Sequence, residues 1–252
     1  PILGYLDPDF LLAMDETMAR LRYLFQTNNE FSITLPGTGM AAMEAAVCNV
    51  VEPGDEIIVG IHGFFGQRMA DIVERHGGTA VRVEVDFGQV VGADRIEAAM
   101  DAHPDAKMVG VVHGETSSGV GQPLEEIGKL VRERDKLFLV DTVCSLGGAN
   151  IPVDEFLIDI CYSGGQMCIG GPAGISCITL NDRALSVRTG PMPRSSLMIV
   201  AVSCARWRSD ATTASTAPRW SAASPACRRP WSESGGSAWP CQRPSAFHSD
   251  SP

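Results

Sequence analysis

Short apolar runs and helical patterns alternate along residues 8–162, and this alternation is the feature that most restricts the fold. The apolar runs lack polar alternation, which is typical of strands covered on both faces. Between them, apolar residues three and four positions apart indicate helices. This order predicts an α/β fold with a mostly parallel sheet and helices on both faces. The predicted strands are 31–35, 56–60, 81–85, 108–112, 137–140 and one that ends at 162. The predicted helices are one that begins at 8 and is ended by Asn28 and Asn29, 40–51, one that ends at 76, 94–102 and 124–134.

The loops that follow the strands are the places to look for a binding site, because ligands bind there in sheets of this kind. The first loop, 36–40, puts two glycines and a threonine directly before a helix. Free backbone N–H groups and the positive end of the helix dipole suit a phosphate at that point. The loop also fits the pattern G-x-G-x-x-A through Ala42, but no acidic residue ends the next strand to hold a ribose. The sequence therefore disfavours a dinucleotide.

Four later features add candidate binding groups, most of them with a simpler structural alternative. Phe65 is either a core aromatic residue or a flat surface for a planar ring. The loop 113–120 is either a polar surface turn or a cluster of small polar ligands. Asp141 ends an apolar strand, so its carboxylate either caps the next turn or holds a protonated ring nitrogen. The glycines of 162–174 allow the backbone to approach a ligand closely.

In their order and spacing, these loops resemble the class V branch of the pyridoxal-phosphate-dependent aminotransferases, which have fold type I. Within that branch the chain is similar to the alanine–glyoxylate and serine–pyruvate aminotransferase group. Gln166 stands where the cysteine desulfurase branch typically has histidine, and this favours the aminotransferases. The resemblance covers about residues 4–182. Its motifs are 36–40, 44–46, 52–55, 63–68, 113–120, 141–148 and 162–166.

The resemblance implies an activity and a cofactor. The cofactor is pyridoxal 5'-phosphate. The reaction is transfer of an amino group from a small amino acid, such as serine or alanine, to a 2-oxo acid, glyoxylate or pyruvate. A homodimer is implied as the assembly.

The resemblance also implies a role for each candidate residue. Phe65 would stack on the pyridine ring, Val143 would pack on its other face, and Thr116 would lie near the ring hydroxyl and the substrate. Asp141 would pair with the ring nitrogen and keep it protonated, which makes the cofactor an electron sink. The residues that would meet the phosphate are Thr38, Gly39 and Met40, with Gln166 assisting.

Met167 departs from the family pattern at the position of the Schiff-base lysine. A thioether can neither form the covalent link nor carry a proton, and the neighbouring thiol of Cys168 cannot form an imine. We therefore predict that transamination by this chain is absent or very slow. Met167 is either an engineered change or sequencing error, or the mark of a naturally inactive paralogue; in the latter case the chain has a cofactor-binding or subunit-interaction role. The lysines of the chain, all expected at the wrong end of the sheet or in a helix, are Lys107, Lys129 and Lys136.

Composition changes sharply after residue 182. Residues 1–182 hold 11 Lys and Arg against 27 Asp and Glu, whereas residues 183–252 hold 9 Arg, no Lys and 3 acids. All four tryptophans and half of the sixteen prolines lie in the second part, and natural disordered tails are poor in aromatic residues. We predict a cofactor-binding large domain at 1–182 that lacks its N-terminal segment. The tail at 183–252, disordered or produced by a reading-frame shift, would replace the small domain that supplies the arginine for the substrate carboxylate.

The overall composition excludes several other classes of function. The formal net charge of −10 disfavours nucleic acid and anionic membranes as partners. No apolar run approaches the roughly 18 to 20 residues that cross a bilayer, so we expect a soluble, cytoplasmic protein. The eight cysteines show neither a CxxC pair nor His/Cys metal spacing, which predicts reduced thiols and no metal site.

Overall fold

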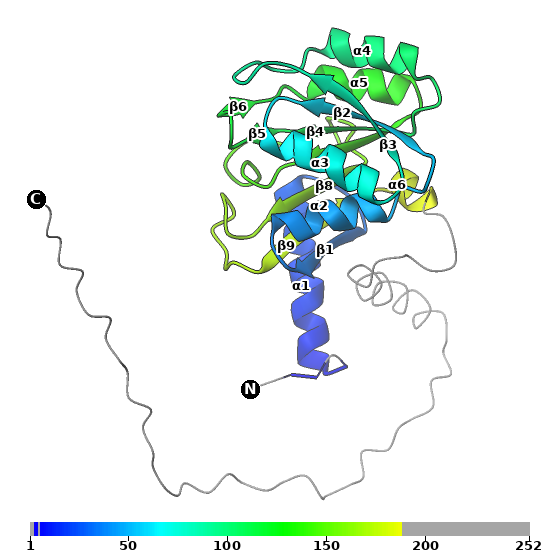
Figure 1. The fold of residues 1–252 in the computed structure, drawn as a ribbon. Coiled ribbons are helices and arrows are strands. Elements are labelled where there is room, and N and C mark those ends of the chain that lie inside the picture. Colours follow the sequence, from blue (N-terminus) through cyan, green and yellow to red (C-terminus); the bar gives the residue numbers. More distant parts are fainter. Residues whose placement is uncertain (1–2, 5, 188–252) are drawn as a thin grey trace, which may run out of the picture. The chain divides into compact units, whose positions relative to one another are not determined.

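The structure, a computed structural model, describes residues 3–4 and 6–187 and contains a seven-stranded sheet covered by helices (Figure 1). The strand order in this sheet is β1-β9-β8-β7-β4-β2-β3, and β5 and β6 form a separate two-stranded ribbon. The strands are β1 (Phe31–Pro36), β2 (Glu56–Ile61), β3 (Thr79–Glu84), β4 (Met108–Val112), β5 (Gly114–Glu115), β6 (Val120–Gly121), β7 (Leu137–Asp141), β8 (Ile160–Gly164) and β9 (Ile175–Leu180).

All strands of the large sheet run in one direction except β9. The central pairs are parallel, and β9 lies antiparallel between β8 and β1, with Ile178 opposite both Tyr162 and Ile33. The mostly parallel sheet predicted from the sequence is therefore confirmed. Because β1 has the same direction as β8, the carboxyl ends of β1, β2, β4, β7 and β8 share one edge.

The helices begin and end close to the predicted positions. The N-cap Asp7 accepts a hydrogen bond from the Asp9 N–H, and Pro8 occupies the first turn of α1. The second helix ends earlier than predicted, because the Asn49 side chain donates back to the Ala45 carbonyl and closes the helix. The helices are α1 (Pro8–Phe25), α2 (Gly39–Cys48), α3 (Phe64–Arg75), α4 (Ala93–Ala102), α5 (Glu125–Glu133) and α6 (Asp182–Ser186).

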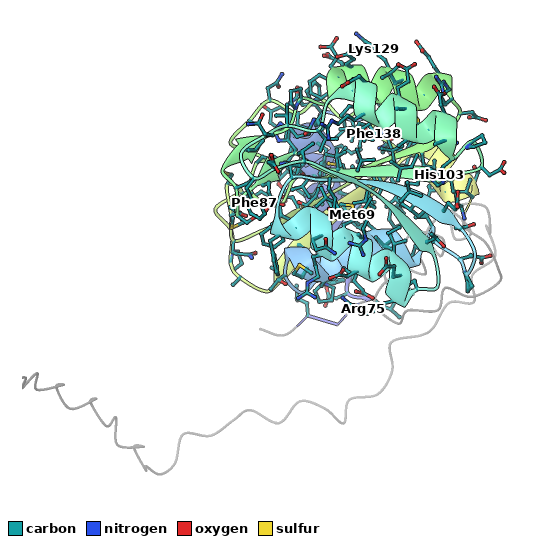
Figure 2. All side chains as sticks on the ribbon, turned by 45° about the horizontal axis from the view of Figure 1, so that its top comes forward. Met69, Arg75, Phe87, His103, Lys129 and Phe138 are labelled. Atoms are coloured by element: carbon teal, nitrogen blue, oxygen red, sulfur yellow. The ribbon has the colours of Figure 1, made fainter. Side chains whose placement is uncertain are left out.

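Two apolar cores lie on opposite faces of the sheet. Helices α2 and α3 bury residues such as Met43 and Met69 on one face. Helices α4, α5 and the last turns of α1 bury residues such as Ile96 and Phe25 against Phe138 on the other. Figure 2 labels Met69 and Phe138, one from each core. The helices on both faces are thus as predicted, and they leave the carboxyl edge of the strands to the loops.

The predicted division of the chain at residue 182 stays a prediction. Helix α6 spans it and packs its buried Ala184 into the core under α2 and α3. Residues 188–252, most of the predicted tail, lie outside the described part of the chain. Among the described helices, none is both long enough and apolar enough to cross a membrane.

Candidate functional site

A cavity of about 280 Å³ opens at the carboxyl edge of the sheet. It is lined by the loops after β1, β2, β4, β7 and β8, which are the loops that the sequence singled out. All nine candidate site residues line it, so the fold brings together residues up to about 130 positions apart in the chain. The lining residues are Thr38, Gly39, Met40, Met43, Phe65, Val112, Gly114, Thr116, Asp141, Val143, Cys144, Gln166 and Met167.

One end of the cavity is the N-terminus of α2. Thr38 is the N-cap of this helix, but its side chain makes no capping hydrogen bond. The first N–H groups of a helix have no partner within the helix, and they carry the positive end of its dipole. Gly39 is packed so closely that an added Cβ would lie 2.6 Å from Val143 Cγ2. Only glycine leaves room at this position for the backbone, which suits the predicted anion site.

The Gln166 side chain lies at the same end of the cavity. A Cβ added to Gly164 would lie 3.2 Å from Gln166 Oε1 and 3.4 Å from the backbone nitrogen of Gly39. Gln166 Oε1 and the first turn of α2 therefore border the same small volume. This is the place where the resemblance put a residue that assists phosphate binding.

Asp141 lies at the floor of the cavity, 2% exposed, with both carboxylate oxygens engaged. Its Oδ1 accepts a hydrogen bond from the Val143 N–H at 2.7 Å, and its Oδ2 accepts one from the Tyr162 hydroxyl at 2.9 Å. Burial raises the pKa of Asp141 to about 7; the two hydrogen bonds act in the opposite direction, and the nearby Glu115 carboxylate adds to the rise. A buried carboxylate of this kind gains most from a cationic partner, because the partner offsets the desolvation of its charge.

Phe65 lies in the first turn of α3. Its surroundings agree in part with both sequence interpretations, a core aromatic residue and a flat surface for a planar ring. The residue is half-buried and packs against the core under α2 and α3, and it also lines the cavity. Its ring meets that of Phe64 edge to face, with centroids 5.4 Å apart. The ring is therefore held from the side and faces the space where a planar ligand would lie.

Met167 lines the cavity, and 36% of its surface is exposed. The lining of the cavity contains no lysine. All three lysines of the chain lie in the described part. Lys107 bonds to Asp55 Oδ2 at 2.7 Å, and Lys136 donates to the carbonyls of Pro104 and Ala106; both precede strands at the amino edge of the sheet. Lys129 is on α5, away from this edge (Figure 2).

Two residues with clear contacts in the site were not among the sequence candidates. Tyr162 is fully buried and bonds to Asp141; its only signal in the sequence was a hydroxyl at the end of a buried strand. Glu115 is also buried, and its carboxylate bonds to backbone N–H groups of α3. The sequence showed it only as one of several small or polar residues of the loop 113–120.

The described residues contain no group of three or more His, Cys, Asp or Glu side chains that would hold a metal ion. The cysteines in this part of the chain are free thiols. Burial raises the pKa of the Cys144 thiol, which lies in the wall of the cavity. This makes Cys144 a weak nucleophile at neutral pH.

The sheet order, the glycine turn at the start of α2 and the buried carboxylate at one strand edge define an α/β protein with a candidate ligand-binding cavity at the carboxyl ends of its strands. Comparison with known sequences gives the family. The model of the family described as Aminotransferase class-V matches residues 6–222, and the chain belongs to this family. The matched range extends past residue 182, where the composition changes.

Individual relatives agree with the family. The chain is 38% identical over 187 residues to an uncharacterized aminotransferase of Methanocaldococcus jannaschii, covering 74% of this chain and 48% of that protein. It is 39% identical over 187 residues to alanine–glyoxylate aminotransferase of Drosophila melanogaster, covering 74% of this chain and 47% of the relative. The chain thus spans about half the length of the curated relatives it matches.

Solved structures show the same fold. Alanine–glyoxylate aminotransferase from Nostoc sp. superposes with a TM-score of 0.78 at 38% identity, covering 81% of this chain and 55% of that one. Ureidoglycine–glyoxylate aminotransferase from Bacillus subtilis gives a TM-score of 0.72 at 40% identity, covering 74% and 48%. The predicted α/β fold of the fold type I aminotransferases is therefore confirmed.

The class V family depends on pyridoxal phosphate, and the cavity fits this cofactor in two respects but not in a third. The close packing of Gly39 on Val143 leaves a cradle at the N-terminus of α2 that a Cβ would fill. Asp141 offers a buried carboxylate for a protonated ring nitrogen. Met167, however, offers no amine for covalent attachment, and there is no lysine among the residues that line the cavity.

Proposed function

We propose that this chain binds pyridoxal 5'-phosphate reversibly, without a covalent link, in the cavity at the carboxyl edge of the sheet. The observation that carries the proposal is the convergence of an anion-binding turn, a stacking ring and a buried carboxylate on one cavity of about 280 Å³. The N–H groups of Thr38, Gly39 and Met40 bind the phosphate, and Gln166 supports them.

The ring of the cofactor is held by three side chains. Phe65 and Val143 pack on its two faces and exclude water from them. Asp141 accepts the hydrogen bond of the ring nitrogen and keeps that nitrogen protonated, since the buried carboxylate is stabilised by the positive charge. When bound, the cofactor supplies an electron sink for the negative charge that forms when an amino acid loses its α-proton.

The ancestral reaction that we propose is amino transfer from a small amino acid, alanine or serine, to glyoxylate or pyruvate. Two relatives, at 39% and 40% identity, are named as aminotransferases that use glyoxylate, which supports this acceptor. Thr116 lines the same cavity as Met167, and we propose that it contacts the substrate there. Because Met167 cannot take up a proton, we propose that this chain carries out the reaction very slowly or not at all.

The second candidate function is that of an inactive homologue that binds the cofactor or a partner subunit. It is favoured by one specific observation: all three lysines of the chain are engaged or placed away from the cavity. The two candidates share the binding site and differ only in turnover.

Titration of the full chain with pyridoxal phosphate, followed by the absorbance of the cofactor, tests the proposal. We expect saturable binding that dialysis reverses, and we expect Asp141→Asn to weaken it by roughly ten- to a hundredfold, because a charge-assisted hydrogen bond is lost. The matched control is Asp159→Asn, which alters a 1% exposed carboxylate bonded to Arg132 and Arg183 at the amino end of β8. Absence of saturable binding, or equal weakening by both variants, would contradict the proposal.

The cytoplasmic location expected from the sequence stays a prediction.

We further propose that the protein is a homodimer. Helix α1 supports the dimer because Leu12 and Tyr23 on it are 67% and 86% exposed. Large apolar residues in such positions are commonly covered by a partner. Sedimentation analysis of the full chain is expected to give twice the chain mass, with a shift to the single-chain mass in Leu12→Glu/Tyr23→Glu; a monomer in the unaltered chain would rule the dimer out.

A further inference from the structure

We propose that Glu115 is a positioning residue for the cofactor cavity: its buried carboxylate fixes the first turn of α3 and so holds the Phe65 ring against the cavity. The proposal deepens the proposed function, on which its cofactor-binding part rests. The contacts of the Glu115 carboxylate carry the proposal.

Glu115 is 1% exposed, and all four contacts of its carboxylate come from neutral donors. Oε2 accepts from the N–H groups of Phe65 and Gly66 at 2.9 and 3.2 Å. Oε1 accepts from the N–H and the hydroxyl of Ser117 at 3.1 and 2.6 Å. No Lys or Arg of the described chain pairs with it. A buried charge without a cation is costly, so these hydrogen bonds are what keeps it in place.

These contacts replace the N-cap that α3 lacks. The residue at the N-cap position is Gly63, which has no side chain to accept a hydrogen bond. The Glu115 carboxylate accepts two of the unpartnered N–H groups, and Ser117 Oγ accepts a third from Phe64 at 2.8 Å. The negative charge also lies at the positive end of the helix dipole. The start of α3 is therefore fixed by a loop 50 positions further along the chain.

The loop that carries Glu115 packs closely against the start of α3. A Cβ added to Gly63 would lie 2.3 Å from Glu115 Cγ and 2.5 Å from Ser117 Oγ. Gly63 has a φ of 174°, which any residue can adopt, so the contact with Glu115 and not the backbone conformation requires glycine. Loop and helix start are thus in direct contact at the cavity wall.

The position of this clamp connects it to the cavity. Phe65, whose N–H is held, and Thr116, which follows Glu115 directly, both line the cavity. A cap from a local Ser, Thr or Asp at position 63 would satisfy α3 equally well but would not tie these two walls together. The arrangement sets the distance between the stacking ring and the polar wall of the site.

The experiment uses the full chain with Glu115→Gln, Phe65→Ala and the double variant. Glu115→Gln keeps the size of the side chain but turns an NH₂ group toward N–H donors. Asp159→Asn is the matched control, because Asp159 is an equally buried carboxylate that accepts a backbone N–H, from Phe138, far from the cavity. Two quantities are measured: hydrogen exchange of the Phe65 and Gly66 amides without cofactor, and the Kd for pyridoxal phosphate.

We expect Glu115→Gln to accelerate exchange of both amides at least about tenfold, while the control leaves them unchanged. Glu115→Gln and Phe65→Ala are each expected to raise the Kd about three- to tenfold, and the double variant no further than Phe65→Ala, because Glu115 acts through Phe65. Unchanged exchange in Glu115→Gln, or additive effects on the Kd, would overturn the positioning role. If the unaltered chain does not bind the cofactor, the proposed function fails, and the exchange data still decide whether Glu115 holds the turn.

Discussion

Asp141 is the residue whose environment has the most consequences for the site. It is buried in a cavity wall, and burial raises the pKa of its carboxyl to about 7 from an ordinary value of 3.8. Between these two pH values the folded chain holds a proton that the unfolded chain has released. The folded state therefore loses stability as the pH rises through this window, and above about pH 7 the loss is complete.

Asp141→Asn tests this dependence because it removes the titrating group. The free energy of unfolding of the unaltered chain should fall relative to that of the variant by about 2 to 3 kcal/mol between about pH 5 and about pH 8. Urea unfolding of both chains without cofactor, at several pH values, measures the difference. A difference that does not vary with pH would show that Asp141 does not titrate in this window.

At the residue scale, the sequence was informative where a side chain acts on a ligand and uninformative where it acts on another side chain. All nine candidates, Asp141 and Met167 among them, stand at or just after the carboxyl end of a strand, and they line one cavity. Tyr162 and Glu115 could not be found in this way. Their partners lie 21 and 50 positions away, and only the folded chain brings them into contact.

Helix α2 is the element on which the anion-binding end of the cavity depends. Its first residue, Gly39, touches the Val143 side chain of the loop after β7. An alanine at 39 would put its Cβ within 2.7 Å of two Val143 methyl carbons, so either the helix or the loop has to move. Both are walls of the cavity.

We predict that Gly39→Ala destabilises the chain by about 1 to 3 kcal/mol through overpacking and weakens cofactor binding at least about tenfold. Urea unfolding and a pyridoxal phosphate titration measure the two effects. Gly121→Ala is the control, because a Cβ at Gly121 would meet nothing within 4 Å. Similar behaviour of the two variants would mean that the close approach of α2 is not needed for binding.

Among the elements, the predicted helices and strands up to β7 are present, because each helix has a helical period and each strand is a short apolar run bounded by turn residues. No strand was predicted for the residues of β9. This strand follows a glycine-rich loop and forms only by pairing with both β8 and β1, whose residues are far away in the chain. Its pairing partners and its direction depend on tertiary contacts, which a local pattern does not contain.

At the scale of the whole molecule, the chain spans about half the length of its curated relatives. The described part contains the large sheet and the cavity. The arginine expected for the substrate carboxylate would belong to a small domain, and the sequence predicts a tail at 183–252 in place of that domain. Cofactor binding is therefore the property to measure on this chain, because the residues proposed to hold the cofactor all lie in the described part. The sequence predicted the family and the fold from motifs within residues 4–182, whereas the family model matches as far as residue 222.

We propose that the cavity binds pyridoxal phosphate and that Met167 alone removes the covalent link. The direct measurement is borohydride reduction of the full chain with one equivalent of cofactor, followed by mass spectrometry of its peptides. The unaltered chain should carry no cofactor at position 167, and Met167→Lys should carry nearly one equivalent there. Lys129, exposed on α5, reports non-specific labelling in the same sample. An unaltered chain labelled stoichiometrically at any lysine, or a Met167→Lys chain labelled no more at 167 than at Lys129, would contradict the account.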